Sequence, residues 1–248
     1  MRILMTGGSG TLGRELRPLL SAHGHEVHAP SHAEMDVLDP DAVMRATRAT
    51  GPDLVLHAAA WTDVAGAERE RHACWALNVE GTRHVRDAAR SVDAPLVHLS
   101  TDYVFWGEEG GYAEDDPPGP VRNYYALTKL VAEEAARAHP RTLVLRTSFR
   151  PRDWPHPVAF EDLFTSQAYV DELAPELALA VTHAPEVPWG TLHVAGPRTS
   201  AYQLARRRTP EVRPGRRADA NVALPADISL DTRRWRDWKR EKRLGAEE

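Results

Sequence analysis

Short apolar runs alternate with longer amphipathic stretches over the first 150 positions of the chain. The apolar runs have strand length and predict buried strands, at residues 2–7, 26–30, 53–60, 95–101 and 142–148. The stretches between them carry apolar residues at helical spacing and predict helices, at residues 11–24, 40–50, 73–92 and 123–139. Strands and helices that alternate in this way are typical of a parallel sheet with helices on both faces. We therefore expect an α/β protein with a doubly wound parallel sheet.

The pattern is less regular after residue 150. Residues 150–157 form a loop interrupted by prolines, residues 166–184 predict a helix despite Pro175, and residues 191–196 predict one more strand. The C-terminal stretch 230–248 is basic and then acidic, which favours a solvated surface helix.

Composition and charge exclude several classes of protein. A chain of 248 residues can bury a sizeable core, and its net charge of −5 gives no reason to expect a nucleic acid or an anionic membrane as partner. The single cysteine, Cys74, cannot form an internal disulfide, and the N-terminus has no long apolar run, so we expect a cytoplasmic protein. The 12 histidines show no metal-ligand spacing, and we expect no metal site.

The first predicted strand leads into a glycine-rich turn that opens the first predicted helix. In "TGGSGTLGREL" (residues 6–16), Gly8, Gly10 and Gly13 fit G-x-G-x-x-G, and Gly7, Gly10 and Gly13 fit G-x-x-G-x-x-G. Glycine permits a tight turn and lets the backbone approach a pyrophosphate, while the helix N-terminus offers N–H groups and a positive dipole end. The motif predicts a dinucleotide cofactor, NADP or NAD, bound by a Rossmann-type fold.

The end of the second predicted strand affects the choice between these dinucleotides. An NAD-selective site places an acid there for the ribose 2′-OH, whereas this chain has "APSH" (residues 29–32), followed by no carboxylate until Glu34 and Asp36. Ser31, His32 or Arg14 could donate hydrogen bonds to a 2′-phosphate. The sequence therefore favours NADP, or the use of both cofactors.

A tyrosine and a lysine, Tyr125 and Lys129, lie four residues apart in the helix predicted at 123–139. This spacing places both side chains on one helical face. A reductase must give a proton to the carbonyl oxygen, but the unperturbed pKa of tyrosine, about 10, is high for that task. We expect the Lys129 ammonium and the nicotinamide cation to bring the pKa of Tyr125 toward neutrality. Tyr124 is the rival tyrosine, but it stands five residues before Lys129 and points off that face.

Hydroxyl side chains end the fourth predicted strand, in "HLSTDYVFWG" (residues 98–107). Ligands of open parallel sheets bind at the carboxyl ends of the strands. Thr101 or Ser100 is therefore well placed to hold the carbonyl oxygen of a substrate.

With these motifs the chain resembles the extended short-chain dehydrogenases/reductases, and among them the dTDP-4-dehydrorhamnose reductase (RmlD-like) family. The resemblance rests on "TGGSGTLG" (6–13), "MDVLDPDAV" (35–43), "HAAAWTDVAGAE" (57–68), "NVEGT" (78–82), "STDYVFWG" (100–107), "YAEDDPPGP" (112–120) and "YYALTKLVAEE" (124–134). Two further segments extend it, "LRTSF" (145–149) and "ISLDTRRW" (228–235).

The resemblance implies an NAD(P)H-dependent reductase of a keto-sugar nucleotide, with Thr101, Tyr125 and Lys129 as its catalytic residues. It assigns residues 1–150 to an NAD(P)-binding domain and residues 151–248 to a small substrate-binding part, partly interleaved with the sheet. The residues expected on the sugar side are Thr62, Val64, Asp102 and Tyr103. The residues expected at the cofactor, besides Tyr125 and Lys129, are Gly7, Gly10, Thr11, Leu12, Gly13, Ser31, Asp36, Val37, Ala58, Ala59 and Ala60. The partner is a small molecule, and we also expect that the chain forms a homodimer.

The chain departs from the family pattern at two places. Trp106 replaces an aspartate, and the region between 150 and 190, where the residues that select the sugar nucleotide lie, is short. Two alternative functions remain open: an epimerase or dehydratase of the same superfamily, or a non-catalytic regulatory subunit that binds NAD(P). Dehydratases place a second acid after the catalytic Thr-Asp, whereas here Asp102 is followed by Tyr103.

Overall fold

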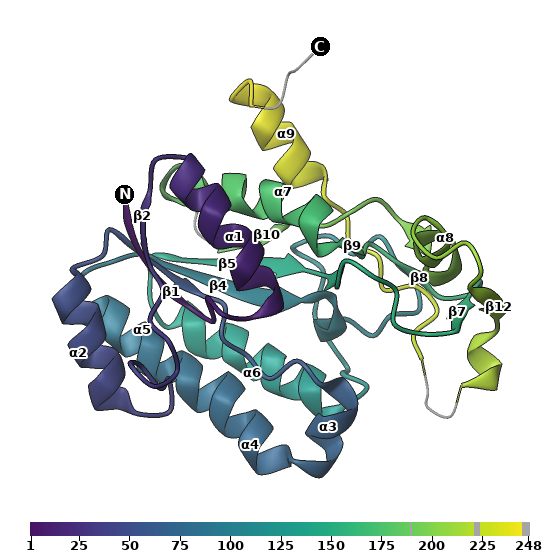
Figure 1. Cartoon of the computed structure of the whole chain (residues 1–248), viewed down its shortest axis with the longest axis horizontal. Helices are drawn as coiled ribbons and strands as arrows, with labels where there is room; N and C mark the ends of the chain where they lie inside the picture. Colours follow the sequence, from purple (N-terminus) through teal and green to yellow (C-terminus); the bar gives the residue numbers. More distant parts are fainter. Residues whose placement is uncertain (189, 221–223, 245–248) are drawn as a thin grey trace.

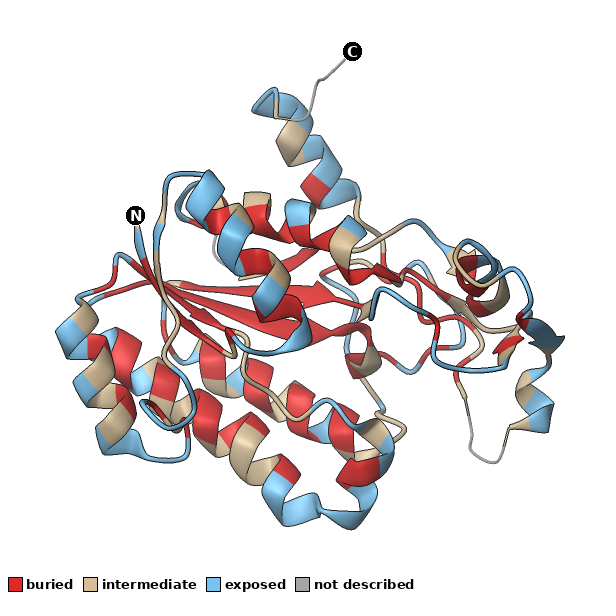
Figure 2. Ribbon diagram, in the orientation of Figure 1, coloured by how far each residue is buried: buried red, intermediate tan, exposed pale blue. Residues whose placement is uncertain are grey.

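Six parallel strands form the central sheet of the computed structural model, which describes residues 1–188, 190–220 and 224–244. The predicted doubly wound sheet is confirmed: the strand order is β10-β5-β4-β3-β1-β2, and every neighbouring pair is parallel. The strands, in chain order, are β1 (Arg2–Thr6), β2 (Glu26–His28), β3 (Leu54–His57), β4 (Leu96–Thr101), β5 (Thr142–Thr147) and β10 (Gly190–His193). Every residue of β3, β4 and β5 is buried, as expected for strands covered on both faces (Figure 2).

Helices cover the two faces of this sheet as separate layers (Figure 1). On one face, α1 (Thr11–Ala22) packs against α7 (Val170–Thr182). On the other face lie α2 (Pro40–Thr50), α5 (Gly81–Ser91) and α6 (Tyr124–Arg137). Helix α1 buries Leu12, Leu16 and Leu20, which recur every four residues and form one stripe against the sheet and α7.

Two of these helices begin at residues that the sequence marks as helix starts. The Asp39 carboxylate accepts hydrogen bonds from the backbone N–H groups of Asp41 and Ala42, at 2.9 and 3.0 Å, and thereby caps α2. The Asn123 side chain accepts from Ala126 N at 2.8 Å and caps α6. The cap of α6 is important for function because it sets where Tyr125 and Lys129 fall on the first turns of that helix.

The helix predicted at 73–92 is divided into three in the structure. It comprises α4 (Arg71–Trp75), a π-helical turn at Ala76–Glu80 and α5, and it is preceded by a short helix that the pattern did not predict, α3 (Val64–Arg69). The π-helical turn contains Asn78, whose amide accepts from Trp61 N at 2.7 Å and donates to Thr128 Oγ1 at 2.9 Å. The turn therefore ties the loop after β3 to α6.

The segments after residue 148 both complete the sheet and form a smaller peripheral part. Helix α7 begins at Val170, not at 166 as predicted, because residues 168–169 form a strand that pairs with residues 149–150. The peripheral part lies at the end of the sheet opposite α2 (Figure 1). It contains β6 (Phe149–Arg150) paired with β9 (Ala168–Tyr169), β7 (Val158–Phe160) with β12 (Arg213–Gly215), β8 (Phe164–Thr165) with β11 (Thr199–Ser200), and α8 (Ala201–Arg206). The predicted division at residue 150 stays a prediction.

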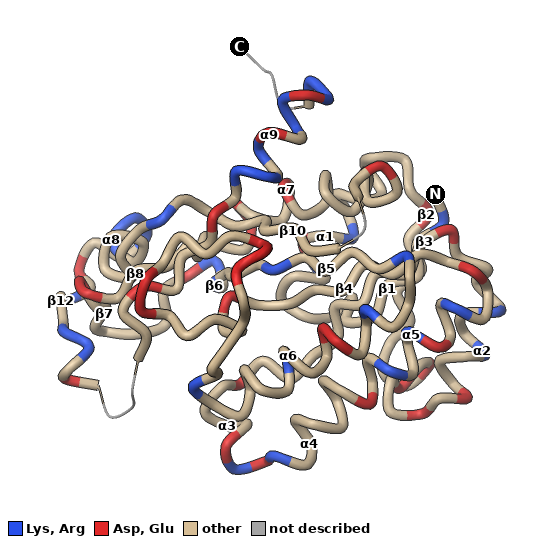
Figure 3. Tube along the Cα trace, turned by 180° about the vertical axis from the view of Figure 1, so that it is seen from behind, with Lys and Arg blue, Asp and Glu red and all other residues tan. Residues whose placement is uncertain are grey.

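The last helix, α9 (Arg233–Glu241), lies in the stretch predicted as a solvated surface helix, of which residues 245–248 lie outside the described residues. Lys, Arg, Asp and Glu make up most of α9 (Figure 3), and most of them are exposed, but Trp235 is 2% exposed. The Trp235 indole and the Lys239 ammonium both donate to the Glu176 carboxylate on α7, at 2.7 Å. The prediction of a wholly solvated helix was therefore wrong on one face, where the tryptophan packs into the core.

Candidate active site

A cavity of about 680 Å³ opens at the carboxyl ends of β1, β3, β4 and β5. It lies where strand order reverses between β1 and β3, the place at which open α/β sheets bind their ligands. Most of the residues predicted for the site line this one cavity. They are Gly7, Gly10, Thr11, Leu12, Gly13, Val37, Ala58, Ala59, Ala60, Thr62, Val64, Thr101, Tyr103, Tyr125 and Lys129.

The glycine turn joins β1 to α1 with very little space for side chains. Gly7 has φ +71°, and a Cβ there would lie 2.7 Å from the Ala58 carbonyl carbon; a Cβ on Gly13 would lie 2.2 Å from the Gly7 oxygen. Gly10 differs, because a Cβ there would meet only the Gly7 oxygen, at 3.2 Å. Gly7 and Gly13 are therefore required by the fold, whereas Gly10 keeps the cavity free of a side chain.

Helix α1 begins at this turn without any side-chain cap, and its first turn contains no acid. Thr11 and Leu12 line the cavity, so the unpaired N–H groups of the helix start and its positive dipole end are available to an anion. On the other side of the turn, the Thr6 hydroxyl accepts from Ala58 N and Ala59 N at 3.1 and 3.0 Å and thereby holds the end of β3 to β1. These residues fit the pyrophosphate of a dinucleotide.

The adenine side of the cavity differs in part from the expectation. Val37 lines it, as does His32, which was considered for a 2′-phosphate, and so do Pro30 and Met35, which the sequence reasoning did not assign. Ser31 and Asp36 do not line it. The Ser31 hydroxyl donates to Glu34 at 2.8 Å, and the Asp36 carboxylate accepts from Leu38 N at 2.9 Å.

Among the groups considered for a 2′-phosphate, only His32 lines the cavity, since Ser31 is bound to Glu34 and Arg14 donates to the Ser9 carbonyl at 2.9 Å. The choice between NADP and NAD stays open on this geometry.

The three predicted catalytic residues come together from two elements. Thr101 ends β4, and Tyr125 and Lys129 lie on consecutive turns of α6, where they are 8% and 3% exposed. The Lys129 ammonium donates to the Leu99 carbonyl at 2.8 Å, which fixes it beneath the cavity. Tyr124, the rival tyrosine, does not line the cavity; its ring lies 5.2 Å from the Arg71 guanidinium.

Burial governs the protonation of this pair. It lowers the pKa of Lys129 to about 8, opposed mainly by the negative charge of Glu133, one turn further along α6. Burial also raises the pKa of Tyr125 far above its ordinary value, although the Thr101 hydroxyl acts in the other direction. In the protein alone, the pKa of Tyr125 is therefore raised and not brought toward neutrality as expected, because desolvation of the phenolate is the largest effect.

Asp102 was expected on the sugar side, but its side chain points into the protein. It is 0% exposed, does not line the cavity, and accepts a hydrogen bond from Thr101 Oγ1 at 3.0 Å. Burial raises the pKa of Asp102 to about 6, against hydrogen bonds from Ser148 and Thr101. Its geometry is that of a residue that orients Thr101, while Tyr103 takes the wall of the cavity and packs edge-on to Tyr125, with ring centroids 5.9 Å apart.

The cavity also has a wall in which the sequence reasoning assigned no individual residue. Arg150 and Gln167 line it on the side of the peripheral part, and Arg150 Nε donates to Gln167 Oε1 at 2.8 Å. No motif contains either residue. Gln167 does lie in the segment that follows the proline-rich loop, where residues that select the sugar were expected.

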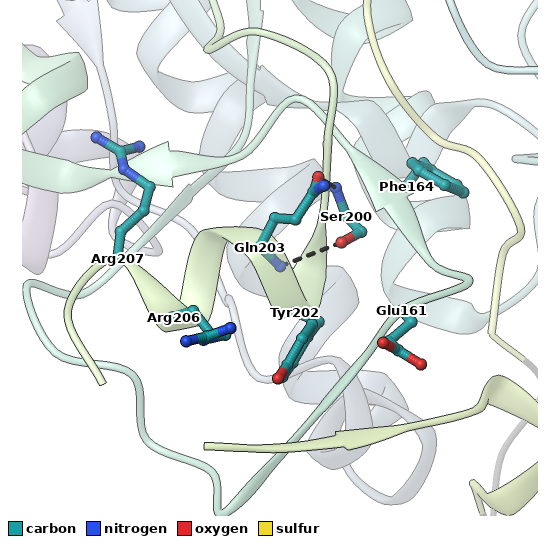
Figure 4. A pocket seen from close by; sticks show the side chains of 7 residues that line it. All are labelled: Glu161, Phe164, Ser200, Tyr202, Gln203, Arg206 and Arg207. Carbon is teal, nitrogen blue, oxygen red and sulfur yellow. Dashed lines mark hydrogen bonds between the residues drawn. The ribbon is translucent and has the colours of Figure 1, made fainter. Parts of the chain in front are cut away.

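Two further cavities contain none of the predicted site residues. One, of about 630 Å³, lies beside α8, where Gln203 N donates to Ser200 Oγ at 3.1 Å (Figure 4). Another, of about 930 Å³, lies beside α9 and β10. The candidate chemistry is therefore concentrated at the cavity of the glycine turn. Within the described residues, no group of three or more His, Cys, Asp or Glu side chains is placed to hold a metal ion.

The fold and the cavity define the class: a Rossmann-type protein in which a glycine turn and a Tyr–Lys pair face the same cavity. A family model described as the RmlD substrate binding domain matches residues 1–150, and the chain belongs to this family. The predicted resemblance is thereby confirmed.

Individual relatives agree with this assignment. A dTDP-4-dehydrorhamnose reductase of Streptomyces griseus is 47% identical over 135 residues, 54% of this chain and 44% of that protein. The chain spans about half the length of the curated relatives it matches. A solved structure of a hypothetical dTDP-4-dehydrorhamnose reductase from Sulfolobus tokodaii is 31% identical, with a TM-score of 0.83 over 96% of this chain and 94% of that chain.

A Bacillus anthracis dTDP-4-dehydrorhamnose reductase solved in complex with NADP has a TM-score of 0.84, covering 98% of this chain and 92% of that chain. Its identity of 24% establishes the shared fold. In the described part of the chain, no helix has the length and hydropathy needed to span a membrane.

Proposed function

We propose that the protein is an NAD(P)H-dependent reductase of a keto-sugar nucleotide, similar to the dTDP-4-dehydrorhamnose reductases. The observation that carries the proposal is the convergence of Thr101, Tyr125 and Lys129 on the cavity that the glycine turn also lines. The names of the relatives support the substrate class. The cofactor, NADPH or NADH, would supply a hydride to the carbonyl carbon.

The residues of the chain perform the remaining steps. The glycine turn and the start of α1 hold the pyrophosphate. The Thr101 hydroxyl, which donates to Asp102 in the protein alone, turns its single proton to the substrate carbonyl oxygen when the substrate binds. Tyr125 gives its phenolic proton to that oxygen as the carbonyl becomes an alcohol. The high pKa of Tyr125 keeps the proton on the phenol until negative charge develops on the substrate, and Lys129 stabilises the phenolate that remains.

The test is cofactor oxidation with a panel of nucleotide-linked 4-keto sugars, led by the dTDP sugars. Consumption of NADPH or NADH that depends on a keto sugar, together with formation of the corresponding alcohol, supports the proposal. Conversion of a sugar with no net cofactor turnover would instead indicate an epimerase or dehydratase. Cofactor binding without any conversion would indicate a regulatory subunit.

Two further expectations belong to this proposal. We propose that residues beyond 150 select the sugar nucleotide, which is supported by Gln167 on the cavity wall. We also propose a homodimer, which light scattering of the purified protein tests directly.

A further inference from the structure

The charge of the main cavity has one sign. Among the described residues that line it there is no Asp or Glu, whereas Lys129, Arg150 and His32 are present. A cavity lined in this way favours ligands with several negative charges. The glycine turn accounts for one anion, the pyrophosphate of the cofactor, and Lys129 belongs to the catalytic residues. Arg150 is left as a cation without a role.

The Arg150 side chain is held in place from two sides. Its Nε donates to Gln167 Oε1 at 2.8 Å, and its guanidinium carbon lies 5.0 Å from the centre of the Trp154 ring. Trp154 is itself 8% exposed and packs in the small core of the peripheral part. These contacts hold the guanidinium in place but leave its two terminal amino groups with no hydrogen bond to the described residues.

The neighbouring arginines are neutralised, and Arg150 is not. Arg146 donates twice to the buried Glu133 carboxylate, and Arg152 donates twice to Glu15, at 2.9 and 2.8 Å. Within the described residues Arg150 has no carboxylate within ion-pair distance, although it lies in the same segment of chain. An arginine held in a fixed geometry without a carboxylate partner, on a cavity wall, is suited to receive an anion from solution.

The position of Arg150 relative to the catalytic residues indicates which anion it can bind. Thr147, the last residue of β5, pairs with Thr101 in the sheet, and Arg150 follows three residues later, so Arg150 lies near the catalytic threonine. Val37, on the adenine side, follows β2, which β4, β3 and β1 separate from β5 in the sheet. Arg150 is thus on the substrate side of the catalytic residues.

We propose that Arg150 binds a phosphoryl group of the diphosphate in the substrate, with Gln167 and Trp154 as its positioning residues. The inference rests on the proposed reductase function and names the contact by which the site distinguishes a nucleotide-linked sugar from a free one. A guanidinium forms two parallel hydrogen bonds with a phosphate, which a lysine at the same place cannot reproduce.

The test is titration calorimetry of dTDP in the presence of saturating NADP⁺, which keeps the probe out of the dinucleotide site. Arg150→Met retains the aliphatic stem and removes the charge. Its affinity for dTDP should fall roughly tenfold to a hundredfold, the range for hydrogen bonds between charged groups. Arg150→Lys should retain part of the affinity. Arg152→Met, at the exposed arginine that pairs with Glu15, is the matched control and should bind dTDP as the wild type does.

Thymidine and NADP⁺ affinities separate a phosphate contact from a general disturbance, and both should be unchanged in Arg150→Met. Three results would overturn the inference: unchanged dTDP affinity in Arg150→Met, an equal loss for thymidine, or no dTDP binding by the wild type. The reductase proposal fails on other evidence, namely no turnover of any keto-sugar nucleotide by a protein that binds dTDP. The two failures are therefore distinguishable.

Discussion

Removal of one partner from the buried ion pair between Glu133 and Arg146, behind the active site, should strongly destabilise the fold. The two side chains are 1% and 3% exposed, and the carboxylate accepts from Arg146 Nε and Nη2 at 2.9 and 2.8 Å. Burial alone raises the pKa of Glu133, but Arg146 outweighs it, so the pKa lies below its ordinary value and the pair is charged. Glu133→Gln removes the negative charge and leaves the arginine buried without it.

The expected loss follows from this burial. Breaking a buried pair on one side costs about 3–5 kcal/mol. For a chain of this length each kcal/mol corresponds to about 2–4 °C in Tm, so Glu133→Gln should melt roughly 6–20 °C below the wild type. The neighbouring Glu134 is the control, because its side chain is 70% exposed and it pairs with Arg137 only at 3.5 Å. Glu134→Gln should change the free energy of unfolding by less than about 1 kcal/mol.

Thermal unfolding of the three proteins, followed by circular dichroism, decides the question. The double variant Glu133→Leu/Arg146→Met should recover much of the loss, because neither charge is then buried alone. A Glu133→Gln protein that melts within two or so degrees of Glu134→Gln would refute the reasoning. Glu133→Gln should also change the pH dependence of activity. The Glu133 charge opposes the lowering of the Lys129 pKa, so its removal should move the fall in activity at alkaline pH to lower pH.

Three further predictions concern the cavity itself. Tyr125→Phe should lower kcat by about 10²–10⁴-fold with little change in cofactor affinity, while Tyr124→Phe stays near the wild type; steady-state kinetics that show the opposite order would overturn the assignment. Gly10→Val should remain folded but show no NADPH binding in calorimetry, and tight binding by the folded variant would contradict the site. Gly13→Val should fail to fold, because its Cβ would lie 2.2 Å from a backbone oxygen. Because the pKa of Lys129 is lowered to about 8, its charge is present below that pH and lost above it, so kcat/KM should decline as pH rises through about 8, and a level profile there would count against the lysine.

The regular part of the fold could be predicted from the sequence because its signals are local. Strands such as 95–101 are continuous apolar runs, and helices such as 40–50 carry a cap at Asp39 and a glycine at Gly51. The peripheral strands have two or three residues each and depend on partners far along the chain. Residues 158–160 pair with 213–215, for example, and no periodicity marks either segment.

The same distinction applies to the site. The glycine turn and the Tyr–Lys pair are spacings within one element, so their residues could be named before the structure was known. Arg150 lines the cavity because a separate strand, residues 168–169, pairs with its own and brings Gln167 beside it. Asp102 was expected on the sugar side because of the family resemblance. A side chain next to the end of a buried strand can also point into the protein, and the Asp102 side chain does so.

The placement of α7 and β10 has a consequence for how the chain can be divided. The leucine stripe of α1 rests on α7, and the edge of β5 is covered by β10, although both elements lie after residue 168. The first 150 residues, which are the part recognised by the family model, thus leave one apolar helix face and one strand edge open when they are made alone. The part that the family model matches and the part able to fold on its own therefore have different borders. During synthesis, the helix that the cofactor turn opens can complete its packing only after α7 has also left the ribosome.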